Sequence, residues 1–271
     1  MDNIREKLHL LNKFFVDKGA VAVAFSGGVD SSFLLKIAHN ALKDNVVAIT
    51  VSSPAHAKHE INAAKKLAKA IGVKHIILAS DKLESGVAKN SIDRCYVCKK
   101  SEFALILGRA KKMGINYVVE GTNTDDQFDY RPGVKAINEL GVFSPLKTYG
   151  FTKSEIRKLS KKLGLPTWNK PSTPCLMSRF PYGNKITINK LRAIEKAEEY
   201  LMGFGISQVR VRHHDAIARI EVNKKDFSVV LQNSERIEKQ LNKLGFRYIT
   251  LDLKGYRTGS MNEVLWKKKI S

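Results

Sequence analysis

Short apolar runs alternate with amphipathic segments along the first 164 residues. Apolar positions recur at helical spacing in several stretches, which predicts helices at 3–18, 31–42, 56–71, 99–113 and 152–163. Between them, compact apolar runs predict buried strands at 21–25, 46–51, 75–78 and 117–120. Such alternation favours right-handed crossovers and a doubly wound, mainly parallel sheet of the α/β class. A ligand site is expected at the carboxyl ends of its strands.

The rhythm changes after Gly164. Residues 165–185 are rich in chain-breaking residues, which predicts a long functional loop at a domain boundary. Beyond it, the pattern predicts a small α+β domain with a helix at 188–202, strands at 208–213 and 217–222, a helix at 225–244 and a strand at 246–253. Thr152-Lys153-Ser154-Glu155 is a capping-box sequence at the start of the 152–163 helix. We therefore expect a first domain over 1–180 and a second over 181–271.

Composition narrows the function classes only partly. Among 271 residues, 43% are hydrophobic and no apolar run reaches the length of a membrane span, so we expect no membrane-spanning helix. The amphipathic, charged N-terminus is unlike a secretory signal, and a cytoplasmic protein is expected. The net charge of +21 fits a nucleic-acid partner, a phosphate-rich small substrate, or a lysine-rich surface without functional meaning. Charge alone does not decide among the three.

A glycine and serine loop joins the first predicted strand to the following helix. Its sequence is Ser26-Gly27-Gly28-Val29-Asp30-Ser31-Ser32. The glycines let backbone amides approach an anion, and the serines and the helix N-terminus add donors and a favourable dipole. The Gly-Lys-Ser/Thr ending of a Walker A loop is missing. A plain Gly-Gly turn would explain neither the serines nor Asp30.

This loop resembles the pyrophosphatase loop (PP-loop), which binds the pyrophosphate of ATP so that AMP is transferred. A second segment, Glu120-Gly121-Thr122-Asn123-Thr124-Asp125-Asp126, resembles the Gly-Thr-Asn-x-Asp-Asp signature of PP-loop adenylating enzymes. Paired carboxylates beside a triphosphate suit Mg²⁺, and Asp126 is the expected metal ligand. The predicted ATP-binding residues are Ala24, Ser26, Gly27, Gly28, Asp30, Ser31, Ser32, Val51, Ser52, Gly121, Thr122 and Asp125.

The chain has three cysteines, Cys95, Cys98 and Cys175. An odd number argues against a disulfide framework. Cys95 and Cys98 have the spacing of a chelating pair. Buried free thiols or a zinc site with a fourth ligand are the alternatives at this point.

Several further motifs resemble the LarE family of ATP-dependent sulfurtransferases, which build the nickel-pincer cofactor of lactate racemase. Together with the cysteine segment at 94–100 they lie at 125–133, 171–183, 209–214, 218–222 and 255–260, so that the resemblance covers nearly the whole chain. The resemblance implies a nicotinate-derived mononucleotide substrate with two carboxylates. ATP adenylates a carboxylate, and sulfur then replaces AMP to leave a thiocarboxylate. It also implies a PP-loop ATP pyrophosphatase fold, of the adenine nucleotide alpha-hydrolase type, and a symmetric homo-oligomer.

The family implies two possible sulfur sources. In three-cysteine members, thiolates matching Cys95, Cys98 and Cys175 hold a [4Fe–4S] cluster whose fourth iron carries the sulfide. In other members, the residue matching Cys175 gives up its own sulfur and becomes dehydroalanine. The three cysteines of this chain favour the cluster.

Other roles are carried over by position. Arg210, Arg212 and Arg257 match arginines that bind a phosphate, whose oxygens suit the guanidinium fork. Lys99 and Arg179 are expected to neutralise charge on the nucleotide or acyl-adenylate. Glu199 and Glu221 match candidate metal ligands of the family, although for Glu199 a charge on the helix surface is the favoured interpretation. A tRNA thiolase, an amidating ligase and a nucleotide sensor remain alternative functions, and tRNA is the alternative partner.

Overall fold

The computed structural model describes residues 2–83, 85–128 and 133–262, and the chain forms two compact units. The first unit contains the described residues up to 82 together with 93–173. The second contains 83–92 and the described residues from 174 onward. None of the described helices is both long and apolar enough to cross a bilayer.

The first unit is built on a parallel sheet of the strands β1 (Val21–Ala24), β2 (Val46–Ser52), β3 (Lys74–Ala79) and β4 (Val118–Val119). The strand order is β3-β2-β1-β4, and every pair in it is parallel. The chain therefore winds outward from β1 to β3 and then returns to the other side of β1. This reversal makes the carboxyl ends of β1 and β4 a topological switch point, where open α/β sheets bind their ligands.

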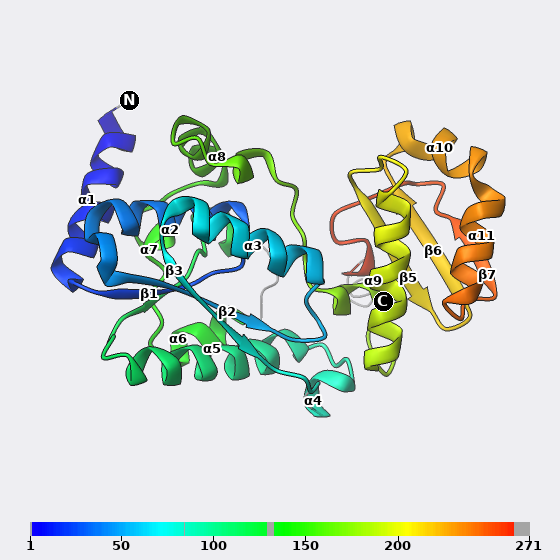
Figure 1. Ribbon diagram of the computed structural model, residues 1–271, viewed down its shortest axis with the longest axis horizontal. Coiled ribbons are helices and arrows are strands. Elements are labelled where there is room, and N and C mark those ends of the chain that lie inside the picture. The colour runs from blue at the N-terminus through cyan, green and yellow to red at the C-terminus, as the bar shows by residue number, and fades with distance from the viewer. Residues whose placement is uncertain (1, 84, 129–132, 263–271) are drawn as a thin grey trace, which may run out of the picture. The chain divides into compact units, whose positions relative to one another are not determined.

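Helices cover both faces of this sheet (Figure 1). On one face, Val21 and Val23 pack with α1 (Asp2–Lys18), α2 (Val29–Leu42), α3 (Lys58–Ile71) and α8 (Lys153–Lys162). On the other, Ala22 packs with α5 (Arg94–Lys112) and α6 (Gly133–Glu139). Successive side chains of β1 thus enter opposite cores, as a strand requires. The doubly wound parallel sheet predicted from the sequence is confirmed.

The second unit is a smaller α+β fold, also as predicted. Its strands are β5 (Val209–His214), β6 (Ile217–Val222) and β7 (Tyr248–Leu251), in that order. The β5–β6 pair is an antiparallel hairpin, whereas β6 and β7 are parallel. Its helices are α4 (Ser85–Ala88), α9 (Ile188–Met202), α10 (Phe227–Gln232) and α11 (Ser234–Lys243).

Two predicted helices differ from the structure. The helix expected at 225–244 is divided into α10 and α11 at Asn233, whose side-chain amide donates to the Val229 carbonyl at 2.9 Å. The helix expected from residue 99 begins at Arg94, so that both cysteines of the first unit lie in its first turns. The short helices α6 and α7 (Pro145–Thr148) were not predicted. The capping box is confirmed, since Thr152 and Glu155 each bond the other's backbone.

Candidate functional site

The loop between β1 and α2 has a backbone that requires glycine. Gly27 has a φ of +69°, a conformation that side chains disfavour. A methyl group built there would also lie 2.9 Å from the Ala64 Cβ of α3. Gly28 follows as the N-cap of α2 in an extended conformation. The loop therefore lies directly against α3 at Gly27.

Serine side chains tie this loop together. The Ser26 and Ser31 hydroxyls lie 3.0 Å apart, and Gly28 donates its N–H to Ser26 Oγ at 3.3 Å. Ser32 donates its hydroxyl to the Gly28 carbonyl at 2.6 Å. The first N–H groups of any helix have no intrahelical acceptor, so a loop shaped in this way is a good cradle for an anion.

The second predicted segment packs directly on this helix start. A methyl group built on Gly121 would lie 2.9 Å from Ser31 N and 3.2 Å from Asp30 Cβ. Thr122 donates its N–H at 2.9 Å and its hydroxyl at 2.8 Å to Glu120 Oε2. Burial raises the pKa of Glu120 despite these bonds. The two segments, far apart in sequence, therefore form one surface at the switch point.

Polar side chains cross between the two segments. Asp30 forms an ion pair with Lys153 at the start of α8 and accepts a bond from the Asn123 side chain at 3.3 Å. Asp126 Oδ2 accepts the Asn123 N–H at 3.0 Å, and Asp125 Oδ2 accepts the Lys153 N–H at 2.8 Å. One oxygen of each paired carboxylate is thus engaged by backbone. The structure brings Asp30, Asp125 and Asp126 into the same polar region.

Two further residues that were predicted to bind ATP, Val51 and Ser52, lie at the same sheet edge. Val51 is buried and Ser52 half-buried at the carboxyl end of β2, beside the end of β1 at Ala24. The side chains of Gln127 and Phe128 and the whole of 129–132, part of a motif noted in the sequence, lie outside the described residues.

Two lysines of this region were not identified from the sequence. One is Lys153. The other is Lys170, which lies beside the glycine loop: its ammonium group donates to the Gly27 carbonyl at 3.2 Å and pairs with Glu60 at 2.5 Å. Burial alone would raise the pKa of Glu60, but hydrogen bonds from His59 and Lys170 lower it to about 2. A signal for Lys153 existed: a lysine in the first turn of a helix opposes the helix dipole, which indicates an anionic partner.

Cys95 and Cys98 lie three residues apart on α5, hence on one face of that helix, and both are half-buried and outside any disulfide. The Cys98 thiol donates to Glu102 Oε1 at 3.4 Å. Glu102 Oε1 is also 3.4 Å from His56 Nε2, and Glu102 Oε2 is 3.1 Å from Lys99 Nζ. Burial raises the pKa of Glu102, but Lys99 and His56 bring it below its usual value. Lys99 therefore already has a carboxylate partner, and Glu102 and His56 are neighbours of the cysteine that sequence patterns did not suggest.

The third cysteine, Cys175, belongs to the second unit and is half-buried. It precedes a 3-10 turn at Leu176–Arg179. Arg179, 3% exposed, forms a buried ion pair with Glu198 at 2.8 Å. Within each unit, over the residues described, no three His, Cys, Asp or Glu side chains gather as a metal site.

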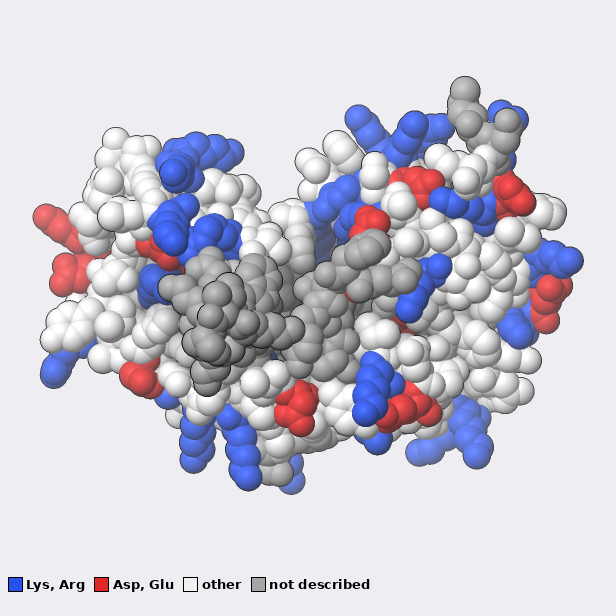
Figure 2. Space-filling model, turned by 180° about the vertical axis from the view of Figure 1, so that it is seen from behind, with Lys and Arg blue, Asp and Glu red and all other residues white. Residues whose placement is uncertain are grey.

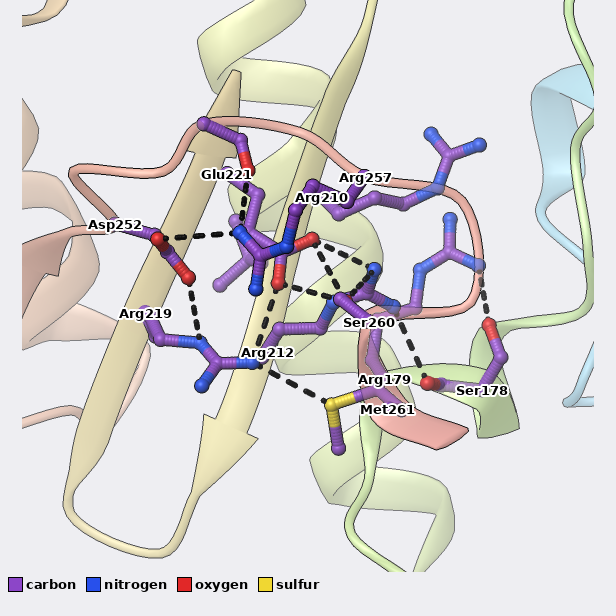
Figure 3. Close-up of polar contacts among 12 residues, drawn as sticks. Ser178, Arg179, Arg210, Arg212, Arg219, Glu221, Asp252, Arg257, Ser260 and Met261 are labelled. Atoms are coloured by element: carbon purple, nitrogen blue, oxygen red, sulfur yellow. Dashed lines mark hydrogen bonds and ion pairs between the residues drawn. The ribbon is translucent and has the colours of Figure 1, made fainter. Parts of the chain in front are cut away.

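Arginines of the second unit form a network with buried carboxylates (Figure 3). Arg212 pairs with Glu221 at 2.7 Å, and Arg257 pairs with Asp252 at 3.4 Å. Burial, followed by the positive charge of Arg179, lowers the pKa of Arg210. The three arginines expected to hold a phosphate therefore lie on β5 and on the segment after β7 within one unit.

The candidate acidic residues differ in their surroundings. Glu221 is fully buried between Arg212 and Arg219, which lie 2.7 and 3.1 Å from its oxygens. Glu199 is exposed on α9, as its helix-surface interpretation predicts. Its neighbour Glu198 is the buried carboxylate, and no sequence pattern indicated it.

Comparisons with known proteins agree with these features. A family model described as "Queuosine biosynthesis protein QueC" matches residues 20–103, which include the loop and the two cysteines of α5. The chain is 40% identical to an uncharacterised protein of Synechocystis sp. over 97% of this chain and 100% of that protein.

Two named enzymes are also similar. The pyridinium-3,5-bisthiocarboxylic acid mononucleotide synthase of Lactiplantibacillus plantarum is 39% identical over 94% of this chain and 93% of that enzyme. The tRNA-specific 2-thiouridylase MnmA of Rickettsia peacockii is 28% identical over 65% of this chain and 58% of that enzyme.

Proposed function

Because the chain belongs to the LarE family of PP-loop enzymes, we propose that it converts carboxylates of a pyridinium-3,5-biscarboxylate mononucleotide to thiocarboxylates. It is an ATP-dependent sulfurtransferase, and the resemblance identified in the sequence is confirmed. The observation that carries the proposal is the contact of Gly121 with the first turn of α2, because it joins both nucleotide segments at one sheet edge.

The first chemical step is adenylation. A substrate carboxylate oxygen attacks the α-phosphorus of ATP, the bond to the β-phosphate breaks, and pyrophosphate leaves. The amides around Gly27 and Gly28 would hold the departing phosphates, and Lys153 and Lys170 would offset their negative charge. Asp126 would bind Mg²⁺, with Asp30 nearby, because carboxylate oxygens are the ligands that this ion prefers.

The second step exchanges AMP for sulfur at the activated carbonyl carbon. We propose that Cys95, Cys98 and Cys175 hold a [4Fe–4S] cluster. The donor set fits, since none of the three cysteines is in a disulfide, and Cys95 and Cys98 share one helix face. When bound, such a cluster supplies an iron without a protein ligand, at which sulfide can be carried. The alternative is that Cys175 itself gives up its sulfur.

Charge in the second unit suits the phosphate of the substrate. Arg210, Arg212, Arg219 and Arg257 lie near one another on β5, β6 and the segment after β7 (Figure 3), and a guanidinium fork pairs with phosphate oxygens bidentately. A phosphate monoester carries about 1.5–2 negative charges near neutral pH. Arg210, Arg212 and Arg257 are the proposed phosphate ligands. Glu221 is a poor ligand for a metal ion, because Arg212 and Arg219 already offset its charge.

A small-molecule substrate is favoured over tRNA. On the face shown in Figure 2, Lys and Arg side chains are scattered and interspersed with Asp and Glu. The similarity to the tRNA thiolase is lower and covers less of the chain than that to the mononucleotide synthase. A homo-oligomer remains a proposal from the family.

Single Cys→Ala variants test the proposal through pyrophosphate release and thiocarboxylate formation. Each variant should release pyrophosphate at the wild-type rate but form no thiocarboxylate. Anaerobically purified wild-type protein should contain about four iron and four sulfide per chain if the cluster is present. Sulfur transfer that survives in Cys95→Ala and Cys98→Ala, with loss in Cys175→Ala alone, would replace the cluster by the sacrificial cysteine. Loss of pyrophosphate release in all three would refute the separation of the two steps.

A further inference from the structure

A buried ion pair lies beneath the turn that carries Cys175. Arg179 donates through Nε to Glu198 Oε1 at 2.9 Å and through Nη2 to Glu198 Oε2 at 2.8 Å. The two side chains are only 4% and 6% exposed. This is the bidentate arrangement in which a guanidinium and a carboxylate fix each other's orientation most firmly.

The remaining donors of Arg179 point at the backbone around the cysteine. Arg179 Nη1 lies 2.7 Å from the Pro174 carbonyl, 3.1 Å from the Cys175 carbonyl and 2.9 Å from Ser178 Oγ. Arginine has five N–H donors, and these contacts leave one of them for any other ligand. With so little exposure, Arg179 is poorly placed to neutralise charge on a bound nucleotide.

Glu198 is fixed in turn by two elements of the fold. It lies on α9, and its Oε1 also accepts the N–H of Val211 in β5 at 2.9 Å. A chain of hydrogen bonds therefore connects β5, through Glu198 and Arg179, to the backbone carbonyl of Cys175. The same turn is held from β5 a second time, because Arg212 Nη1 lies 3.2 Å from the Ser178 carbonyl.

Such a pair needs an explanation other than stability. Removing two charges from water costs several kcal/mol, roughly what their attraction returns, so well-packed apolar side chains often serve stability as well. What apolar side chains cannot do is donate to two adjacent carbonyls and set the direction of the intervening Cα–Cβ bond. Pro174, with its restricted φ, limits the turn from the other side.

We propose that Arg179 and Glu198 are positioning residues that hold the Cys175 thiol in the orientation that sulfur transfer requires. The proposal rests on the proposed function, in which Cys175 takes part in the sulfur step. It gives Arg179 a role through the cysteine in place of one toward the nucleotide. It also adds Glu198 to the residues on which the reaction depends.

The test compares Glu198→Gln with Glu238→Gln, the same substitution at an exposed glutamate on α11 of the same unit. A glutamine side chain at 198 has the same shape as glutamate but places an N–H₂ group against a guanidinium N–H donor. The bidentate pair with Arg179 is therefore lost. Glu198→Gln should lower kcat for thiocarboxylate formation at least tenfold with KM little changed, while pyrophosphate release stays within twofold. Glu238→Gln should match the wild type in every measurement.

A second readout reports on the thiol itself. In a Cys95→Ala/Cys98→Ala background Cys175 is the only thiol, and its rate of alkylation by iodoacetamide can be followed directly. Adding Glu198→Gln should raise this rate at least threefold, because the turn loosens and a negative charge is removed. If Glu198→Gln does not fold, Glu198→Asp shortens the link by one methylene and should give the same changes.

The outcomes separate the two proposals. Unchanged alkylation together with unchanged sulfur transfer in a folded Glu198 variant would overturn the positioning role. Undiminished sulfur transfer in Cys175→Ala would instead overturn the proposed function, and the alkylation rates would still decide whether the pair orients the thiol.

Discussion

The contact between Gly121 and α2 gives the sharpest quantitative prediction. In Gly121→Ala the new methyl group would lie 2.9 Å from Ser31 N and 3.2 Å from the Asp30 carbonyl carbon. Ordinary contacts begin near 3.4 Å, so the strand end and the helix must separate by about half an ångström. Both contacting atoms belong to backbone, so no side-chain rotation relieves the clash.

The loss of stability expected for Gly121→Ala depends on the buried side chains of α2. The helix buries Phe33, Leu34 and Leu35, so moving its first turn disturbs a packed core. Overpacking of this kind costs about 1–3 kcal/mol in the free energy of unfolding. A misplacement of 1 Å at a reacting centre costs about 100-fold in rate, so half that distance should cost roughly tenfold.

The assay is ATP-dependent pyrophosphate release with substrate present, alongside urea denaturation. Gly108→Ala is the matched control, because Gly108 is exposed in α5 and a methyl group there meets nothing within 4 Å. The control should keep its activity and gain about 1 kcal/mol, the difference between alanine and glycine in a helix. If Gly121→Ala behaves like this control in both measurements, the two nucleotide segments do not meet as described.

Three further predictions concern single contacts. Glu60 has its pKa lowered from 4.5 to about 2, so its charged form stabilises the fold above pH 4.5 and this stabilisation is lost as pH falls toward 2. Solvent screening weakens a partly exposed pair, so Glu60→Gln should lose roughly 1–2 kcal/mol at pH 7, and its denaturation curve should converge with the wild type at acid pH; a constant difference would contradict this. Lys153→Met removes the partner of Asp30 and should raise KM for ATP roughly tenfold, with Lys153→Arg intermediate; an unchanged KM would exclude a role at the nucleotide. Thr152→Ala deletes the acceptor of the Glu155 N–H at 3.3 Å and should cost about 1 kcal/mol by urea titration, with ATP turnover retained in the folded protein.

The parallel sheet, the glycine loop and the capping box were all predicted from the sequence because each depends on neighbouring residues. A left-handed φ at Gly27 and an N-cap at Thr152 are local requirements that only a few residue types satisfy. The start of α5 was predicted wrongly, because residues 94–98 carry no apolar periodicity and are helical only as the continuation of a packed helix. The break at Asn233 was missed for a related reason: one side-chain bond to Val229 ends a helix that the periodicity continues.

The sequence by itself determined which residue types are present for nucleotide binding and sulfur chemistry, and in which order. Only the tertiary structure decided which of them meet. Asp30 finds Lys153 across 123 positions, and Glu198 rather than Glu199 is buried because its face of α9 packs on β5. Adjacent helical residues point about 100° apart, so the choice between them depends on where the helix docks and not on the helix itself. The periodicity of a helix or strand follows from its own backbone geometry. The contact partners of its side chains depend on how segments far apart in the sequence pack together.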